Sequence, residues 1–258
     1  MSHAAPATVA AAENMNHFEQ EPESMNTQPH DHLVKSYDEE MSRLTGEIAA
    51  MGELATKQLE AAMDALGKRD SKAAQRVADN DDAIDDQERR ISGDVLRLLA
   101  LRQPMARDLR EVLAALRIAS DIERVGDYAT NIARRSMTLN LSAPIPLVGS
   151  LSPMARMACR LLRDAMRAYT AQDANLAYAV WERDADLDAL YTTLFRELLT
   201  YMMEDPRSIT ACTHLLFIAK NIERIGDHAT NIAENIWFVV RGETLNEPRT
   251  RRDEASGP

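Results

Sequence analysis

The feature that most constrains this sequence is an internal repeat. The segment 122–133, IERVGDYATNIA, recurs 100 residues later at 222–233, and 10 of its 12 positions are identical. The two differences are Val125/Ile225 and Tyr128/His228. A repeat of this length within one chain indicates a duplicated structural unit, so the fold has to be built from the same unit twice.

The repeat extends upstream of this motif. Five residues match at a constant offset of 103: Met63, Asp70, Val77, Asp81 and Asp85 correspond to Met166, Asp173, Val180, Asp184 and Asp188. A three-residue length change in the loop before the motif reconciles the two offsets. The two halves of the chain are therefore copies of one another, well beyond the motif itself.

The periodicity of the apolar residues predicts helices. In both copies of the motif, apolar residues recur at alternating spacings of three and four, which is typical of the buried stripe of a helix in an antiparallel bundle. Only 9 residues are Gly, and the Pro residues lie in the tails or between periodic segments, where they do not interrupt helices. We predict six helices, at about 33–67, 71–101, 105–140, 151–171, 173–204 and 206–241. Asp70, Asp173 and Asp205 are the predicted N-cap residues.

The predicted fold class is therefore all-α, with two tandem three-helix bundles of antiparallel helices. The first domain is expected at residues 33–140 and the second at 145–242. Residues 1–32 and 243–258 are polar and lack apolar periodicity, which predicts disordered tails.

Composition narrows the functional classes. The formal net charge of −11 opposes general binding to nucleic acid, because an acidic surface repels a phosphate backbone. The two cysteines, Cys159 and Cys212, have no paired spacing, so we expect buried thiols and a reducing compartment. No apolar run approaches the roughly 20 residues that a membrane-spanning helix needs, and no secretory signal is recognisable. The expected location is the cytoplasm.

A row of polar side chains follows each motif helix. Glu123, Asp127 and Asn131 are spaced at i, i+4 and i+8, and the second copy repeats the row with Glu223, Asp227 and Asn231. Their register against the apolar stripe places them away from the core, along a shallow groove with a neighbouring helix. The alternative interpretation is an ordinary solvated helix face, on which an ion pair between Arg124 and Asp127 would stabilise the helix by a few tenths of a kcal/mol.

Two observations favour a function for this row. Carboxylates at i and i+4 repel each other unless a cation binds, and this row is identical in both copies while most other surface positions differ. Carboxylate and amide oxygens suit cations such as Mg, Mn, Fe or Zn. Asp85 and Asp188, from the preceding helices, are predicted to complete the two sites, with Asp81 and Asp184 as weaker candidates.

Three further residues in the motifs carry predictions. His228 could add a nitrogen ligand in the second copy, although a lone His is more often an ordinary surface residue. Gly126 and Gly226 lie in the middle of helices, where Gly costs about 1 kcal/mol relative to Ala, and this predicts the close approach of another group.

Catalytic motifs are not recognisable in the sequence. There is no nucleophile constellation with supporting context, no phosphate-binding loop and no dinucleotide-binding loop. We therefore expect a protein that is not an enzyme. The alternative is a metalloenzyme that acts on phosphate esters through carboxylate-bound metal ions.

The motifs themselves resemble a known family. DIERVGDYATNIA (Asp121–Ala133) and NIERIGDHATNIA (Asn221–Ala233) resemble the paired motifs of the PhoU family, and the loops RQPMARDLR (Arg102–Arg110) and LLTYMMEDPRSI (Leu198–Ile209) resemble that family's loops. The resemblance covers about residues 33–243, in order.

This resemblance implies a cytoplasmic regulator of phosphate uptake without catalysis, and commonly a homodimer. Such proteins are thought to connect the ATPase subunit of the phosphate ABC transporter with the phosphate-sensing histidine kinase, and to repress the phosphate-starvation response when phosphate is plentiful. Some bind metal clusters through an E-x-x-x-D motif, which corresponds here to Glu123/Asp127 and Glu223/Asp227. Because Asp121 in one copy is Asn221 in the other, the affinities of the two sites are expected to differ.

Overall fold

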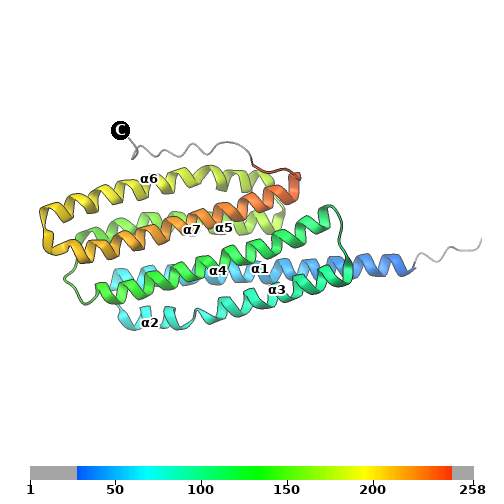
Figure 1. Cartoon of the computed structure of the whole chain (residues 1–258), viewed down its shortest axis with the longest axis horizontal. Coiled ribbons are helices and arrows are strands. Elements are labelled where there is room, and N and C mark those ends of the chain that lie inside the picture. The colour runs from blue at the N-terminus through cyan, green and yellow to red at the C-terminus, as the bar shows by residue number, and fades with distance from the viewer. Residues whose placement is uncertain (1–27, 246–258) are drawn as a thin grey trace, which may run out of the picture.

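The structure, a computed structural model, describes residues 28–245, with side chains from Tyr37 onward, and this part of the chain contains helices and no strand. The all-α prediction is therefore confirmed. The elements are α1 (Gln28–Lys68), α2 (Ser71–Asp79), α3 (Asp82–Arg102), α4 (Arg107–Leu139), η1 (Pro146–Ser150), α5 (Leu151–Ala171), α6 (Ala174–Glu204), η2 (Pro206–Ser208) and α7 (Ile209–Arg241). Figure 1 shows the first repeat, α1 to α4, lying lengthwise against the second, α5 to α7.

The helices of the first repeat differ from the prediction in two ways. Helix α1 begins at Gln28 rather than at residue 33. Residues 1–27 of the predicted N-terminal tail and residues 246–258 of the predicted C-terminal tail lie outside the described residues. The expected helix 71–101 is divided between α2 and α3. Asn80 ends α2, with its N–H donating to the Val77 carbonyl. The second repeat has Arg183 at the position of Asn80, and α6 continues through it, since Arg favours helix interiors more than Asn does.

The predicted helix caps are confirmed. Asp70 accepts hydrogen bonds from the backbone N–H groups of Lys72 and Ala73, both at 3.0 Å. Asp173 accepts in the same way from Asn175 and Leu176. These matched caps fix the start of the second helical segment in each repeat, because they satisfy backbone donors that have no partner within the helix.

The apolar stripes of α4 and α7 form the centre of the molecule. Each residue of the predicted stripes is at most 2% exposed: Ala115, Ile118, Ile122, Val125, Ala129, Ile132, Leu215, Ile218, Ile222, Ile225, Ala229, Ile232 and Ile236. Cys159 and Cys212 are also buried, as predicted. The buried residues of the two repeats join in one contiguous core, so neither repeat has a closed core of its own.

The two repeats are related by an approximate two-fold axis. Asp121 of α4 contacts His228 of α7, whereas Arg135 near the end of α4 lies over the ring of Phe217 near the start of α7. The numbers rise along one helix as they fall along the other, so α4 and α7 are antiparallel. The equivalent residues Tyr128 and His228 contact each other, with ring centroids 5.6 Å apart, which places them close to the axis.

The two motif glycines permit close packing of neighbouring helices, as predicted. A Cβ at Gly126 would lie 2.8 Å from Cδ1 of Ile84 in α3, and a Cβ at Gly226 would overlap Cδ2 of Leu187 in α6. Ile84 and Leu187 are equivalent positions in the two repeats, at an offset of 103. The glycines therefore let α3 and α6 approach the motif helices in the same way.

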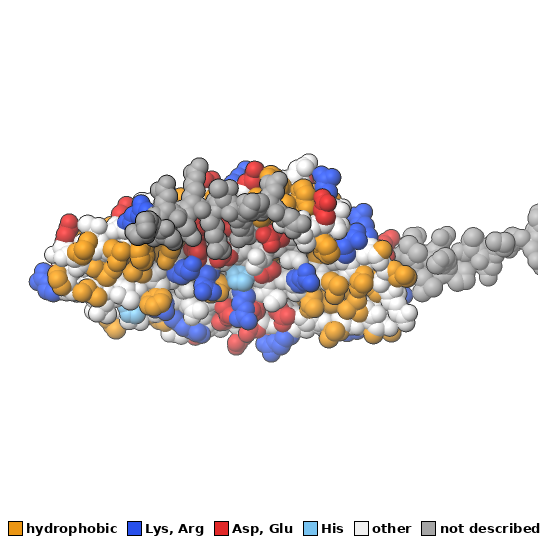
Figure 2. All heavy atoms as spheres, turned by 45° about the horizontal axis from the view of Figure 1, so that its top comes forward, with side chains coloured by type: hydrophobic (Ala, Val, Ile, Leu, Met, Phe, Trp, Pro, Cys, Tyr) orange, Lys and Arg blue, Asp and Glu red, His pale blue; other side chains and the backbone are white. Residues whose placement is uncertain are grey.

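The surface has an uneven distribution of apolar side chains. Figure 2 shows hydrophobic groups gathered at both ends of one face, with acidic and basic groups between them. Exposed large hydrophobic residues include Leu96, Leu101 and Met105 around the α3–α4 connection, and Leu199, Met203 and Ile209 around the α6–α7 connection. No helix of the described residues combines the length and the apolar character that a membrane crossing requires.

Candidate functional site

The acidic row of the first repeat lies on α4 where it faces α3. The Glu123 side chain is 23% exposed and that of Asp127 is 35% exposed. Arg124 lies between them, with Nη1 donating to Asp127 at 3.1 Å and Nε lying 3.5 Å from Glu123. The predicted Arg124–Asp127 pair is confirmed, but at this exposure it contributes less than about 1 kcal/mol.

Helix α3 adds further carboxylates to this row. Burial raises the pKa of Glu123, and the carboxylates of Asp127, Asp85 and Glu88 raise it further. Burial likewise raises the pKa of Asp85, followed by repulsion from Asp81 and Asp127. Asp85 therefore lies within electrostatic range of Glu123 and Asp127, while its role as a ligand stays a prediction. Glu88 was not predicted from the sequence, because the second repeat has Tyr191 at the equivalent position and the two repeats therefore share no carboxylate there.

The second repeat holds a more buried version of the row. The Glu223 side chain is only 12% exposed, and Lys220 Nζ donates to its Oε1 at 2.6 Å. Burial raises the pKa of Glu223, as do Asp227 and Asp188, and the Lys220 ammonium opposes them. Its other oxygen, Oε2, is buried and has no hydrogen-bond partner among the described residues. Lys220 also was not predicted, since the first repeat has Ser120 at that position.

The prediction that the whole row lies on the surface is wrong in part. Asn131 is exposed, but the four motif carboxylates are partly or mostly shielded, because the motif glycines let α3 and α6 pack close beside them. Asn231 donates to Asp121 at 3.3 Å and so belongs to the contact between the two repeats.

His228 and Asp184 occupy different environments from those expected of ligands. His228 Nδ1 lies 2.8 Å from Asp121 Oδ1, across the contact between α7 and α4. Its ring therefore joins the repeats rather than pointing along the acidic row. Asp184 is 5% exposed, and its Oδ1 lies 3.4 Å from the Cβ position of Gly226, inside the packing of α6 against α7.

The side chains of the acidic rows are oxygen donors of the kind that cations bind, but they do not form an enclosed metal site. No three Asp, Glu, His or Cys side chains within the described part of the chain converge closely enough to enclose a metal ion. One oxygen of Glu223 and one of Asp81, however, are buried and have no hydrogen-bond partner within residues 37–245, and a buried carboxylate oxygen left unpaired is costly. In each repeat, a hard or borderline cation beside the motif helix would offset the mutual repulsion of the carboxylates, and in the second it could also satisfy the free oxygen of Glu223.

The raised pKa of Glu223 predicts a pH-dependent stability difference. A carboxyl whose pKa rises on folding stabilises the folded state below its ordinary pKa of 4.5, and that stability is lost as pH rises through the folded-state value. In the presence of a chelator, which keeps the protein free of metal, Glu223→Gln is therefore expected to unfold at a higher urea concentration than the wild type at pH 7. The difference should shrink toward pH 4. A difference that stays constant over this range would show that ionisation of Glu223 does not destabilise the metal-free protein.

Comparison with known proteins places this arrangement in one family. The PhoU domain family matches residues 48–136 and 151–236, one match in each repeat. A "Phosphate-specific transport system accessory protein PhoU homolog" of Xylella fastidiosa strain 9a5c is 57% identical over 232 residues, covering 90% of this chain and 98% of that protein. A protein of the same description from Caulobacter vibrioides is 48% identical over 224 residues, covering 86% of this chain and 97% of that protein.

Solved structures agree with the sequence relatives. PhoU from Pseudomonas aeruginosa superimposes with a TM-score of 0.78 at 38% identity, over 80% of this chain and 100% of that one. The phosphate transport system regulatory protein PhoU from Streptococcus pneumoniae gives a TM-score of 0.76 at 28% identity, over 82% and 100%. The match extends over both repeats and nearly the full length of each relative, and on this ground the chain belongs to the PhoU family.

Proposed function

We propose that this protein is a cytoplasmic regulator of phosphate uptake that represses the phosphate-starvation response when phosphate is plentiful. Its relatives are named as accessory proteins of the phosphate-specific transport system, and they align with it at 57% and 48% identity. This similarity supports a role in phosphate transport. The finer proposal is that the chain connects the ATPase subunit of the phosphate ABC transporter with the phosphate-sensing histidine kinase.

The observation that carries this proposal is the match of both repeats to one family. A chain of two helical repeats with one shared core presents several long helical surfaces for partners and does not need a catalytic pocket. The proposal includes homodimer formation, since the family commonly dimerises.

The acidic rows supply the proposed cation sites. In the first repeat Glu123, Asp127 and Asp85 would hold the cation, with Asn131 at the open end of the row. In the second, the corresponding ligands would be Glu223, Asp227 and Asp188, with Asn231 beyond them. A cation such as Mg, Mn, Fe or Zn would link each motif helix to its neighbour by neutralising carboxylates on both. The first site is expected to bind more tightly, because Glu88 adds charge there while Lys220 competes for Glu223.

Calorimetric titration tests the adaptor role. The full chain, in metal-loaded and metal-free forms, would be titrated with the purified ATPase subunit and with the cytoplasmic domain of the kinase from the same host. Saturable binding to at least one of them is expected. Heat signals no larger than the heat of dilution, for both partner proteins and for the metal-loaded and metal-free forms of the chain, would reject the adaptor role. Turnover of phosphate esters that disappears in Glu123→Ala/Asp127→Ala would instead establish the metalloenzyme alternative.

A further inference from the structure

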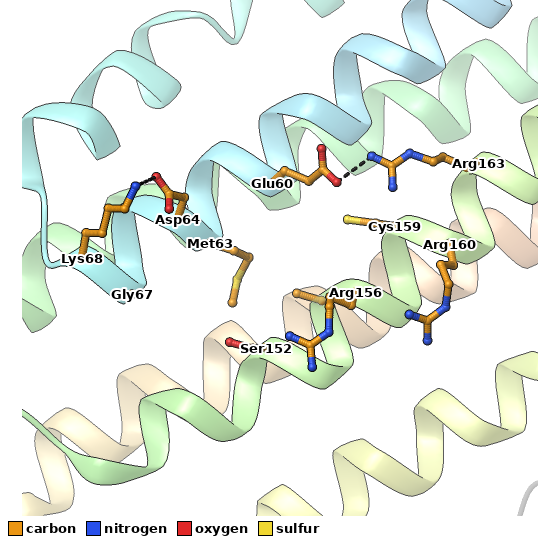
Figure 3. A pocket seen from close by; sticks show the side chains of 11 residues that line it. Glu60, Met63, Asp64, Gly67, Lys68, Ser152, Arg156, Cys159, Arg160 and Arg163 are labelled. Atoms are coloured by element: carbon orange, nitrogen blue, oxygen red, sulfur yellow. Dashed lines mark hydrogen bonds and ion pairs between the residues drawn. The ribbon is translucent and has the colours of Figure 1, made fainter.

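A groove of about 620 Å³ runs between α1 and α5, on elements that do not carry the acidic rows. Ala155 and Cys159, which are 5% and 4% exposed, lie at its base, together with the partly buried Met63. Figure 3 shows Met63 and Cys159 directed into the space between the two helices. This base is apolar, whereas the groove walls are charged.

The α5 wall carries a stripe of arginines. Arg156, Arg160, Arg163 and Arg167 are spaced at i, i+4, i+7 and i+11, which places them on one side of the helix. Arg163 donates to Glu60 of α1 at 2.6 Å, and Arg167 to Asp164 at 3.3 Å. Arg156 and Arg160 are exposed and make no hydrogen bond or ion pair with the described residues, and in Figure 3 they extend from successive turns to the same side.

The fold does not require these arginines. The equivalent positions of α1, 103 residues earlier, are Glu53, Lys57, Glu60 and Asp64. The same helix surface thus carries three acidic residues and one lysine in one repeat and four arginines in the other. Two guanidinium groups one turn apart repel each other by a few tenths of a kcal/mol unless an anion lies between them. Two neighbouring arginines without a partner among the described residues, in a chain of net charge −11, therefore point to an anionic partner.

The walls and the base of the groove select among anionic partners. Glu60 and Asp64 on the α1 side pair with Arg163 and Lys68, so the two cations left without a partner in the described part of the chain, Arg156 and Arg160, lie beside an apolar base. The overall negative charge of the chain opposes an anionic membrane surface. The lining stretch from Ser152 to Arg163 spans about three helical turns, or roughly 18 Å. A helix of that length can place acidic side chains one turn apart against Arg156 and Arg160, and an apolar side chain over the base.

We propose that this groove docks an acidic amphipathic helix of a protein partner, with Arg156 and Arg160 as the specificity-determining residues. The inference rests on the proposed function, because the partner meant is a component of the phosphate uptake or sensing system. Arginine suits this role since its planar guanidinium binds carboxylates through two hydrogen bonds.

Charge reversal tests the groove. The ATPase subunit and the kinase domain would each be titrated against the wild type, Arg156→Glu/Arg160→Glu and the control Arg76→Glu/Arg196→Glu. The control changes the net charge equally, at two exposed arginines outside the groove. For the protein that binds the wild type, the groove variant is expected to bind at least about tenfold more weakly at low salt, with a smaller difference at high salt, and the control to bind normally. Equal affinity of the groove variant and the wild type would overturn the groove proposal alone, whereas a wild type that binds neither protein would overturn the proposed function and this inference with it.

Two further measurements separate the groove partner from other anions. Inorganic phosphate and vesicles rich in anionic lipid would be tested with the wild type and the groove variant. If phosphate or the vesicles bind the wild type but not the groove variant, while both bind the protein partner with equal affinity, the proposal is overturned. The groove would then be a small-anion or membrane site. Arg156→Lys/Arg160→Lys, which keeps the charge, is expected to retain part of the affinity. Unchanged thermal unfolding of all variants confirms that the fold is intact.

Discussion

Protein purified without a chelator is expected to carry a divalent or iron-type cation, and Glu123→Ala/Asp127→Ala/Glu223→Ala/Asp227→Ala is expected to carry none. The substitutions remove the carboxylates that repel one another in the seams of α4 with α3 and of α7 with α6. Elemental analysis of both proteins measures the difference. In the wild type, metal at about 100 times its Kd should stabilise the fold by about 2.7 kcal/mol. In the variant that lacks the four motif carboxylates, the same metal concentration should leave the unfolding temperature unchanged.

A matched control keeps this result specific. Asp38→Ala/Glu39→Ala/Glu197→Ala/Glu204→Ala removes the same four negative charges at exposed positions outside the rows. It is expected to bind metal like the wild type. Equal metal content in the wild type and in the variant that lacks the four motif carboxylates would reject the proposed ligands. Two further variants would each lack the motif carboxylates of one repeat. The first repeat is expected to bind metal at lower metal concentrations than the second, because it has Glu88 and no equivalent of Lys220.

Gly226→Leu is expected to lower the free energy of unfolding by about 2 kcal/mol. The new side chain would overlap Leu187 and crowd Asp184, which forces α6 away from α7. This overpacking outweighs the gain of about 1 kcal/mol that Leu brings over Gly in a helix. In a protein of this size the loss lowers the unfolding temperature by roughly 4–8 °C, which calorimetry can measure. Separating the helices also moves Asp188 away from Glu223, so metal affinity in the second repeat should fall.

Gly93 provides the opposite case. It lies inside α3, is exposed, and a Cβ there would meet nothing within 4 Å. Gly93→Leu is therefore expected to raise the free energy of unfolding by about 1 kcal/mol, the helix preference of Leu over Gly. If both variants were stabilised, the close packing assigned to the motif glycine would be wrong.

The fold was largely predictable because its signals are local and doubled. Apolar spacing, caps at Asp70 and Asp173, and a repeat at offsets of 100 and 103 define the helices and their order. The break at Asn80 was missed because it occurs in one repeat only. A shared core could not be predicted either, since the apolar stripes show which side of a helix is buried but not which repeat covers it.

The candidate site was predictable only where the two repeats agree. Asp85 and Asp188 were predicted as ligands because they occur at matching positions, and both act electrostatically on carboxylates of the motif helices. Glu88, Lys220 and the contact of His228 with Asp121 depend on positions that differ between the repeats. The shielding of Glu223 was underestimated, because it depends on how closely α6 packs on Gly226, which is a tertiary property.

The most direct test of the regulatory role is alkaline phosphatase activity in phosphate-rich medium, in the host strain with and without this gene. We expect high activity in the deletion strain, repression on complementation with the wild-type gene, and incomplete repression with the variant lacking Glu123, Asp127, Glu223 and Asp227. Low activity in the deletion strain, equal to that of the parent, would contradict repression of the phosphate-starvation response by this protein.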